Sequence, residues 1–472
     1  MADQKISDLT EITSADSAVD FLPVVDSSES KTKKIKLANF PLSDASEDTA
    51  YPYTIDIQAG VEQTRNLTTI SNSDGFYNTY QPDSIYIGTN VTSIGFAAFS
   101  NSNFAGANLT NQSVFIPDSV TTIGSFAFYY SALTSIKLPN NPAFTSIEQD
   151  TFGGCVFLTS IVIPDSVETI GDRAIRGCTS LASATIGNSV TSIADSAFDF
   201  CTSLTSIVIP DSVETIGSAA FYRCTDLASV TLPNNNNFTS IENTTFKDCT
   251  SLTSVTIPNS VTSIGIDAFR NCTDLTSITL PTNVNFTSIE NNTFYGCIGL
   301  SSVTIPDSVT NIGTSAFQSC GLTSITIPDS VSTIKLRAFQ GCDRVESLTL
   351  PSNTGFFTIE QFTFAELRSL LSLTIPTTVT TIGSYAFRNL DVLTTVEIPI
   401  SVGSIGERAF QGCNLLNTIN CNVDKTVIDN AINIFLGTAS PLTINVPVGT
   451  SGWVAGSGLN IGGNANVTVN II

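Results

Sequence analysis

Cysteine is the residue type with the widest chemical range in this chain, and it recurs at one repeated position. Ten of the eleven cysteines form a column spaced by 22 to 25 residues, with Leu367 and Leu390 in the same column where cysteine is missing. The ten are Cys155, Cys178, Cys201, Cys224, Cys249, Cys272, Cys297, Cys320, Cys342 and Cys413. Such thiols could form disulfides, bind metal or act as nucleophiles, but a position that accepts leucine needs none of this chemistry. We predict reduced, buried and unreactive thiols, and Cys421, outside the column, receives no predicted role.

The sequence contains no histidine, so it excludes catalytic sites that depend on an imidazole group. It leaves no Ser-His-Asp or Cys-His arrangement, and zinc-binding cysteines are usually about two to four residues apart. Several coils share an IPDSV motif, and we interpret its aspartates as turn caps rather than calcium ligands. They include Asp165, Asp211, Asp307 and Asp329. The sequence predicts no catalytic residue, no metal site and no cofactor, and it leaves open a pair of carboxylates that meet across neighbouring coils.

The cysteine column belongs to a longer repeat that defines the fold. A phenylalanine stands three residues before the column in all but one of the copies. In LTSIVIP (204–210), inward Ile207 and Ile209 alternate with outward Ser206 and Val208, the period of a half-buried strand. Pro210 then ends the ladder because it has no N–H group. We predict a mainly β solenoid of about 14 coils, with short 3₁₀ or turn segments on the side opposite the main parallel sheet.

The full pattern, Leu-x-x-Ile-x-Ile-Pro-x-x-Val-x-x-Ile-Gly-x-x-Ala-Phe-x-x-Cys, resembles the BspA-like, or treponemal, class of leucine-rich repeat over residues 85–420. The resemblance implies a right-handed leucine-rich repeat solenoid. It also implies kinship with surface or secreted adhesion and binding proteins. Fold follows more firmly than function from such a resemblance.

Two sets of polar residues are candidate ligand-binding positions. Outward threonines form a hydroxyl row along the sheet, and four coils carry two extra residues in an Asn-rich loop after the strand. The threonine candidates are Thr256, Thr279, Thr304, Thr326, Thr349 and Thr374. The loop candidates are Asn234, Asn235, Asn236, Asn237, Asn283 and Asn285. The alternative is that threonine simply favours exposed strands and that the loops are spacers.

The two ends of the chain depart from the repeat. Residues 1–45 contain KISDLT, LPVV and TKKI, a pattern that resembles the attachment element of phage and other viral tail or fibre proteins, and the segment around DSSES reads as a two-stranded hairpin. An N-terminal cap of the solenoid is the alternative. Residues 46–84 are expected to be a connector or cap, and residues 421–472 a C-terminal β cap.

Charge narrows the possible partners. The net charge of -22 disfavours nucleic acid and anionic membranes, and the sequence predicts no secretory signal and no membrane insertion. The leading hypothesis is a non-enzymatic virion protein made in a host cytoplasm. It would bind a tail or capsid protein through residues 1–45 and a host-surface glycan or protein through the solenoid, with homo-oligomerisation possible. The alternatives are a cell-surface or extracellular adhesin and, less favoured, a polysaccharide-degrading solenoid enzyme.

Overall fold

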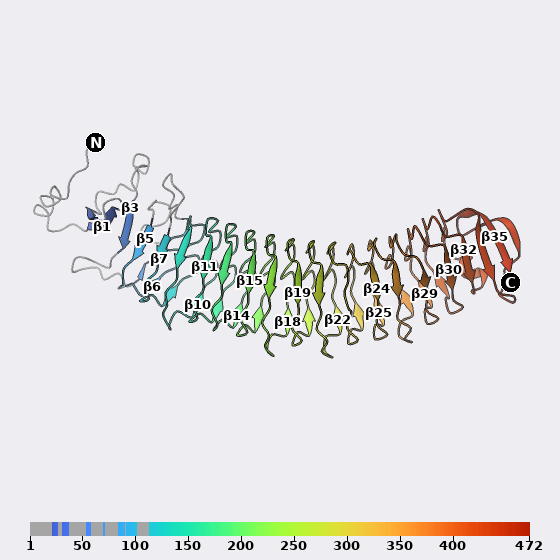
Figure 1. The fold of residues 1–472 in the computed structure, drawn as a ribbon, viewed down its shortest axis with the longest axis horizontal. Coiled ribbons are helices and arrows are strands. Elements are labelled where there is room, and N and C mark those ends of the chain that lie inside the picture. Colours follow the sequence, from blue (N-terminus) through green and yellow to red (C-terminus); the bar gives the residue numbers. More distant parts are fainter. Residues whose placement is uncertain are drawn as a thin grey trace, which may run out of the picture. The chain divides into compact units, whose positions relative to one another are not determined.

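The computed structural model describes residues 84–89, 91–101 and 113–472, together with four strands nearer the N-terminus. Those strands are β1 (Phe21–Asp26), β2 (Lys31–Lys36), β3 (Tyr53–Ile57) and β4 (Thr69–Ile70). The chain forms two compact units, residues 1–213 and 214–472. Each unit is a parallel β solenoid in which one main strand per coil lies beside the next (Figure 1). About 16 coils are present, slightly more than the cysteine column indicates.

Each regular coil contains a main strand, a short strand and a series of turns. In the first unit the main strands are β5 (Ser84–Ile87), β7 (Ser113–Phe115), β9 (Ser135–Lys137), β11 (Ser160–Val162), β13 (Ser183–Thr185) and β15 (Ser206–Val208). In the second unit they are β17 (Ser229–Thr231), β19 (Ser254–Thr256), β21 (Ser277–Thr279), β24 (Ser324–Thr326), β26 (Ser347–Thr349), β28 (Leu373–Thr374), β30 (Thr395–Ile398), β32 (Thr418–Cys421), β33 (Leu442–Val446) and β35 (Asn464–Ile471).

The short strands form a second set of parallel ladders. In the first unit β4 is followed by β6 (Ser93–Ile94), β8 (Thr122–Ile123), β10 (Ser146–Ile147), β12 (Thr169–Ile170) and β14 (Ser192–Ile193). In the second unit they are β16 (Thr215–Ile216), β18 (Ser240–Ile241), β20 (Ser263–Ile264), β22 (Ser288–Ile289), β23 (Asn311–Ile312), β25 (Thr333–Ile334), β27 (Thr358–Ile359), β29 (Thr381–Ile382) and β31 (Ser404–Ile405). The isoleucine of each pair from β6 onward is buried and its partner is at least partly exposed, which places one apolar residue per coil in the core.

Period-two alternation decides which residues enter the core. In β15, Ile207 is buried between exposed Ser206 and Val208, as the sequence predicts. The repeated phenylalanines of neighbouring coils stack on one another, and we call this column, in which Ile175 replaces one ring, the spine. Phe246 and Phe269 have ring centroids 5.4 Å apart, and Phe269 and Phe294 have centroids 5.8 Å apart. Because these rings are fully buried, the spine contributes apolar burial to the coil interfaces and adds aromatic stacking wherever two phenylalanines are neighbours.

The turns around each spine residue join neighbouring coils through alternate N–H groups. Phe269 N donates to Thr293 O at 3.0 Å and Asn271 N donates to Tyr295 O at 2.7 Å, whereas Arg270 N turns back to Asp267 O of its own coil. Asp267 and Asn271 have φ of 59° and 58°, a left-handed conformation that asparagine and aspartate tolerate better than most residues. We call the surface formed by these turns the turn face.

The ends extend the same ladders. The predicted N-terminal strands pair as an antiparallel hairpin, β1 with β2, and β1 also pairs with β3, which begins the parallel ladder through β5. The hairpin therefore borders the edge of the first sheet, as a cap would. Beyond residue 420, β32, β33 and β35 continue in parallel, and β34 (Gly456–Ile461) pairs antiparallel to β35. The α-helix described there is α2 (Lys425–Asp429).

Candidate binding surfaces

The outward side chains of the main strands form one candidate surface. Ser254 pairs with Ser277 and Thr256 with Thr279 across β19 and β21, and the residues between them are buried. The same register joins Ser324 to Ser347 and Thr326 to Thr349 across β24 and β26. Parallel pairing places equivalent hydroxyls about 4.8 Å apart. The structure therefore brings four of the six candidate threonines into two regular pairs.

The other two threonines are placed less regularly. Thr304 is exposed but belongs to no strand, so the main ladder is interrupted between β21 and β24 in this described part of the chain. The interruption precedes the 22-residue coil, where Gly321 approaches Ile298 O so closely that a Cβ atom would collide with it. Thr374 ends β28 and pairs with Glu397. The predicted row of six is thus interrupted at Thr304, and beyond Thr374 a glutamate takes the next place.

The candidate threonines differ from other threonines of the same coils in whether their hydroxyls form hydrogen bonds. Thr253 Oγ1 donates to Ala228 O and Thr276 Oγ1 donates to Thr253 O, both at 3.1 Å, so those hydroxyls link one coil to the preceding one. The hydroxyls of Thr256 and Thr279, three residues further on, are exposed and have no hydrogen-bond partner within the described chain. Thr326 and Thr349 are equally unpaired. These hydroxyls are available to a ligand.

The Asn-rich loops contain side chains of two kinds. Asn283 Nδ2 donates to Asn259 O at 2.9 Å and to Val261 O at 2.7 Å, and its Oδ1 accepts from the N–H groups of Asn285 and Phe286. Both the N–H₂ group and the oxygen of this side-chain amide are therefore hydrogen-bonded within the protein. It fixes the loop against the preceding coil.

Asn235 plays the same part in its own loop, because its Oδ1 accepts from the N–H groups of Asn237 and Phe238. Asn234, Asn236, Asn237 and Asn285 are exposed, and Asn237 Nδ2 donates to Glu214 Oε1 at 2.7 Å. Each loop also buries its final phenylalanine, at the position that Val213 occupies in a shorter coil. These four residues are Phe144, Phe238, Phe286 and Phe356. The loops are thus packed against the solenoid, and only some of their asparagine side chains are exposed to solvent.

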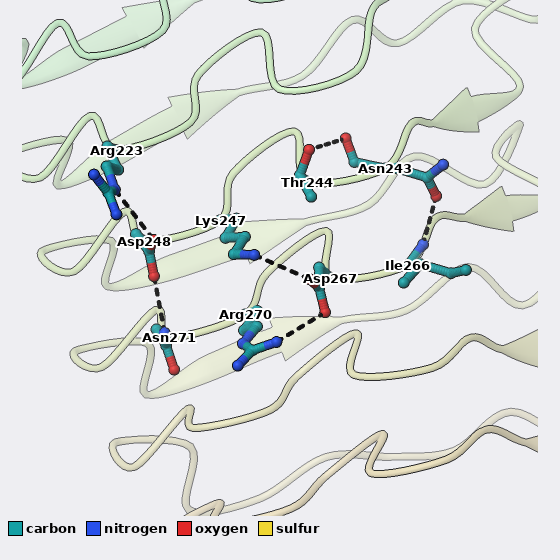
Figure 2. A network of polar contacts seen from close by, with 9 residues as sticks. All are labelled: Arg223, Asn243, Thr244, Lys247, Asp248, Ile266, Asp267, Arg270 and Asn271. Carbon is teal, nitrogen blue, oxygen red and sulfur yellow. Dashed lines mark hydrogen bonds and ion pairs between the residues drawn. The ribbon is translucent and has the colours of Figure 1, made fainter.

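The turn face carries basic residues that the sequence analysis did not single out, and most are neutralised within the protein. Figure 2 shows Arg223 beside Asp248 at 3.5 Å, with Asp267 contacted by Lys247 at 3.0 Å and by Arg270 at 3.6 Å. Ion pairs at such exposure contribute little, about 0 to 1 kcal/mol each. Arg223–Asp248 and Lys247–Asp267 link neighbouring coils, whereas Arg270 and Asp267 belong to the same coil. The sequence signal for these pairs was the recurrence of charged residues within two positions of the spine.

The cysteine column is buried and reduced, as predicted: all eleven thiols are free and shielded. Nine column thiols donate to the carbonyl of the preceding coil's spine residue. Cys297 Sγ, for example, lies 3.2 Å from Phe269 O, and Cys320 Sγ lies 3.0 Å from Phe294 O. Burial raises the pKa of Cys297 to about 12 and that of Cys421 to about 11, so the thiolate form is disfavoured. These cysteines close coil interfaces and are not nucleophiles at neutral pH.

Two of the corner aspartates bind the backbone of the following coil. Asp165 Oδ1 accepts from Asn188 N at 2.8 Å and Asp329 Oδ1 accepts from Ser352 N at 2.7 Å, each across one coil. Among the described residues, no cluster of three or more acidic or cysteine side chains has the geometry to hold a metal ion. Nor does that part of the chain include a helix of the length and apolarity that a bilayer crossing requires.

Stacked parallel coils with an apolar spine and exposed polar strands define a leucine-rich solenoid. The family model described as "BspA type Leucine rich repeat region (6 copies)" matches residues 68–204, 191–321, 268–389 and 357–447. These matches cover more than half of the chain. The protein therefore belongs to the BspA-type leucine-rich repeat family, as its repeat pattern predicts.

Solved structures give the same class of fold. A leucine-rich repeat protein from Bacteroides ovatus ATCC 8483 is 22% identical over 86% of this chain and 92% of its own, with a TM-score of 0.52. A leucine rich cell surface protein from Faecalibacterium prausnitzii A2-165 is 28% identical over 80% of this chain and 92% of its own, with a TM-score of 0.45. No curated protein matches the sequence. The first similarity confirms the solenoid fold.

Proposed function

We propose that the protein is a non-enzymatic binding protein displayed on a cell surface, and that its ligand lies across the main strands of the second unit. The observation that carries this proposal is the set of exposed, unpaired hydroxyls of Thr256, Thr279, Thr326 and Thr349 on a regular parallel sheet. Each hydroxyl offers a weak contact, and several contacts to one extended glycan or protein surface add together. Membership of the BspA-type family supports a surface role.

The family match favours this alternative over a virion protein. The resemblance of residues 1–45 to a viral attachment element has no counterpart in the matched family model, which begins at residue 68. Within that segment the structure describes β1 and β2, and their pairing beside β3 is also what a solenoid cap requires. The rest of the predicted attachment segment lies outside the described residues.

Binding to an array of immobilised glycans and secreted proteins tests the proposal. The full chain should retain a ligand that a Thr256→Lys/Thr279→Lys/Thr326→Lys/Thr349→Lys variant does not, since long charged side chains would obstruct the sheet surface. A Thr333→Lys variant is the matched control, because Thr333 is also an exposed strand threonine but lies in short strand β25. Equal binding by the quadruple variant, at unchanged thermal stability, would place recognition elsewhere.

The non-enzymatic part of the proposal has its own test. The ligand recovered from the array is incubated with the full chain, and product is sought by mass spectrometry and by an assay for new reducing ends. Unchanged ligand is expected because the described residues contain no histidine and no activated thiol. Steady accumulation of cleaved ligand would show that paired carboxylates act as catalysts.

A further inference from the structure

Four successive coils of the second unit carry bulky side chains two residues before the spine. They are Arg337, Phe362, Tyr385 and Arg408. Phe362 and Tyr385 stack with centroids 4.7 Å apart and planes 7° apart. The Arg337 guanidinium lies 5.2 Å from the Phe362 ring, and the Arg408 guanidinium lies 5.8 Å from the Tyr385 ring. We call this group, together with Arg388 at 5.9 Å from the Tyr385 ring, the Arg–aromatic stack.

The fold does not require these side chains. The same position two residues before the spine is occupied by Ala219, Ser315 and Asn433 in other coils, all with φ between 53° and 57°. Bulky residues meet the same left-handed backbone at Phe362 and Tyr385, with φ of 58° at both. Because alanine or serine meets the structural need, the run of arginines and rings calls for another explanation.

Charge distinguishes the stack from the rest of the turn face. Arg223, Lys247 and Arg270 each contact an aspartate. Arg337 and Arg388, by contrast, form no ion pair with any residue that the structure describes. The stack therefore carries two guanidinium groups without a carboxylate partner in the described chain, on a protein whose net charge is -22. Guanidinium groups without a carboxylate partner attract an anionic ligand.

Arg408 is held rather than free. Its Nη1 donates to the Tyr385 hydroxyl at 2.7 Å, and its Nε lies 3.3 Å from Glu407 Oε1. The neighbouring rings and hydroxyl limit the motion of this guanidinium, which lowers the entropy lost when it binds a carboxylate.

We propose that the Arg–aromatic stack binds an acidic peptide segment of a partner protein. Arginine forms bidentate bonds with carboxylates, and arginine and aromatic residues are enriched at protein interfaces. A sugar ring would need an uncovered aromatic face, but Phe362 and Tyr385 cover each other and the two arginines lie over their remaining faces. What remains for a ligand is N–H donors and ring edges.

Spacing agrees with an extended peptide. Arg337 and Arg408 are three coils apart, which is about 14 Å at the spacing of parallel strands. An extended peptide advances about 3.4 Å per residue, so carboxylates four residues apart on one side of it would reach both guanidinium groups, with Arg388 between them. This site is on the turn face and is independent of the hydroxyl pairs in the proposed function.

Fluorescence anisotropy with the full chain tests the assignment. The probe is a fluorescein-labelled peptide in which glutamate alternates with serine, compared with the same peptide carrying glutamine. The glutamate peptide should bind, and an Arg337→Gln/Arg388→Gln variant should lose about tenfold or more in affinity because two carboxylate contacts disappear. Affinity should fall as salt is raised.

Two further variants separate the site from general charge and from folding. Arg223→Gln removes one positive charge from the turn face at an already paired arginine, so binding should not change. Phe362→Ser/Tyr385→Ser should weaken binding and leave the chain folded with a small loss of thermal stability from the missing stacked pair, because serine is native at this position in Ser315.

The proposal fails if the glutamate peptide does not bind, if the glutamine peptide binds as well, or if Arg337→Gln/Arg388→Gln is without effect. Tighter binding of an oligogalacturonate than of the glutamate peptide would overturn the peptide assignment in favour of an acidic glycan.

Discussion

Replacement of Phe269 by alanine removes one ring from the middle of the spine in the second unit. The side chain is 0% exposed and stacks on Phe246 at 14° and on Phe294 at 13°. Its carbonyl also accepts the thiol of Cys297 from the following coil. The substitution therefore opens a cavity at two coil interfaces at once.

The expected cost is about 3 to 5 kcal/mol, the range for truncation of a buried phenylalanine to alanine. Two stacked pairs account for about 1 to 3 kcal/mol of this, at about 0.5 to 1.5 kcal/mol per aromatic pair. Phe269→Ile separates these contributions, because Ile175 is the native spine residue of one coil and keeps most of the apolar volume. That variant should lose mainly the stacking contribution.

Hydrogen exchange combined with denaturant unfolding is the suitable assay, since a solenoid opens locally and a single transition is not guaranteed. The N–H groups of Phe269 and Asn271, which bond to the next coil, should exchange faster than those of distant coils. Phe357→Ala is the control: this ring is 54% exposed, and its loss should change stability by no more than about 0.5 kcal/mol. A cost below about 1 kcal/mol for Phe269→Ala would refute the inward, stacked assignment of the spine.

Two other substitutions test the cysteine column and the Asn-rich loops. Burial raises the pKa of Cys342 from 9.0 to about 12, so the unfolded chain loses this proton first and the free energy of unfolding should fall above about pH 9. Cys342→Leu introduces the residue that Leu367 supplies in the same column and removes the titrating thiol. The variant should lose about 2 kcal/mol less free energy of unfolding at about pH 10.5, at about 1.4 kcal/mol per pH unit above the unfolded pKa. Urea unfolding across pH measures this difference. An identical pH dependence in the variant, or rapid thiol labelling of the native column, would contradict this assignment. Asn283→Ala should cost about 1 to 3 kcal/mol because two carbonyls and the Asn285 N–H lose their partner, while Phe286 N keeps its bond to the Asn283 backbone O. Asn285→Ala, at an exposed side chain, should be nearly neutral in thermal unfolding. Equal melting temperatures for the two asparagine variants would mean that the loop does not depend on Asn283.

The repeat allowed most of the architecture to be predicted from the sequence. Each coil contacts a near-copy of itself about 23 residues away, so the local pattern of one coil also describes its tertiary neighbours. The inward phase of Ile207, the spine and the inert cysteine column followed from this identity. Leu367 and Leu390 were informative because they showed what the column tolerates.

Tertiary structure alone decided which polar side chains remain available. Thr253 and Thr256 are the same residue type three positions apart, yet the hydroxyl of the first bonds to Ala228 O and that of the second has no partner among the residues that the structure describes. Asn283 and Asn285 differ in the same way. The cause is the direction of each side chain relative to the carbonyls of the adjacent coil, and residue type does not specify that direction.

The Arg–aromatic stack also separates what the sequence determines from what the tertiary structure determines. The sequence alone determined that arginine, phenylalanine, tyrosine and arginine occupy one repeated position from Arg337 to Arg408. Stacking of the coils then brought residues 23 or 25 positions apart to separations of 4.7 to 5.8 Å between ring centroids and guanidinium groups. Among the residues that the structure describes, Arg337 and Arg388 have no carboxylate partner. Sequence order fixes which residues share a column, whereas the contacts of each side chain depend on the backbone that packs beside it.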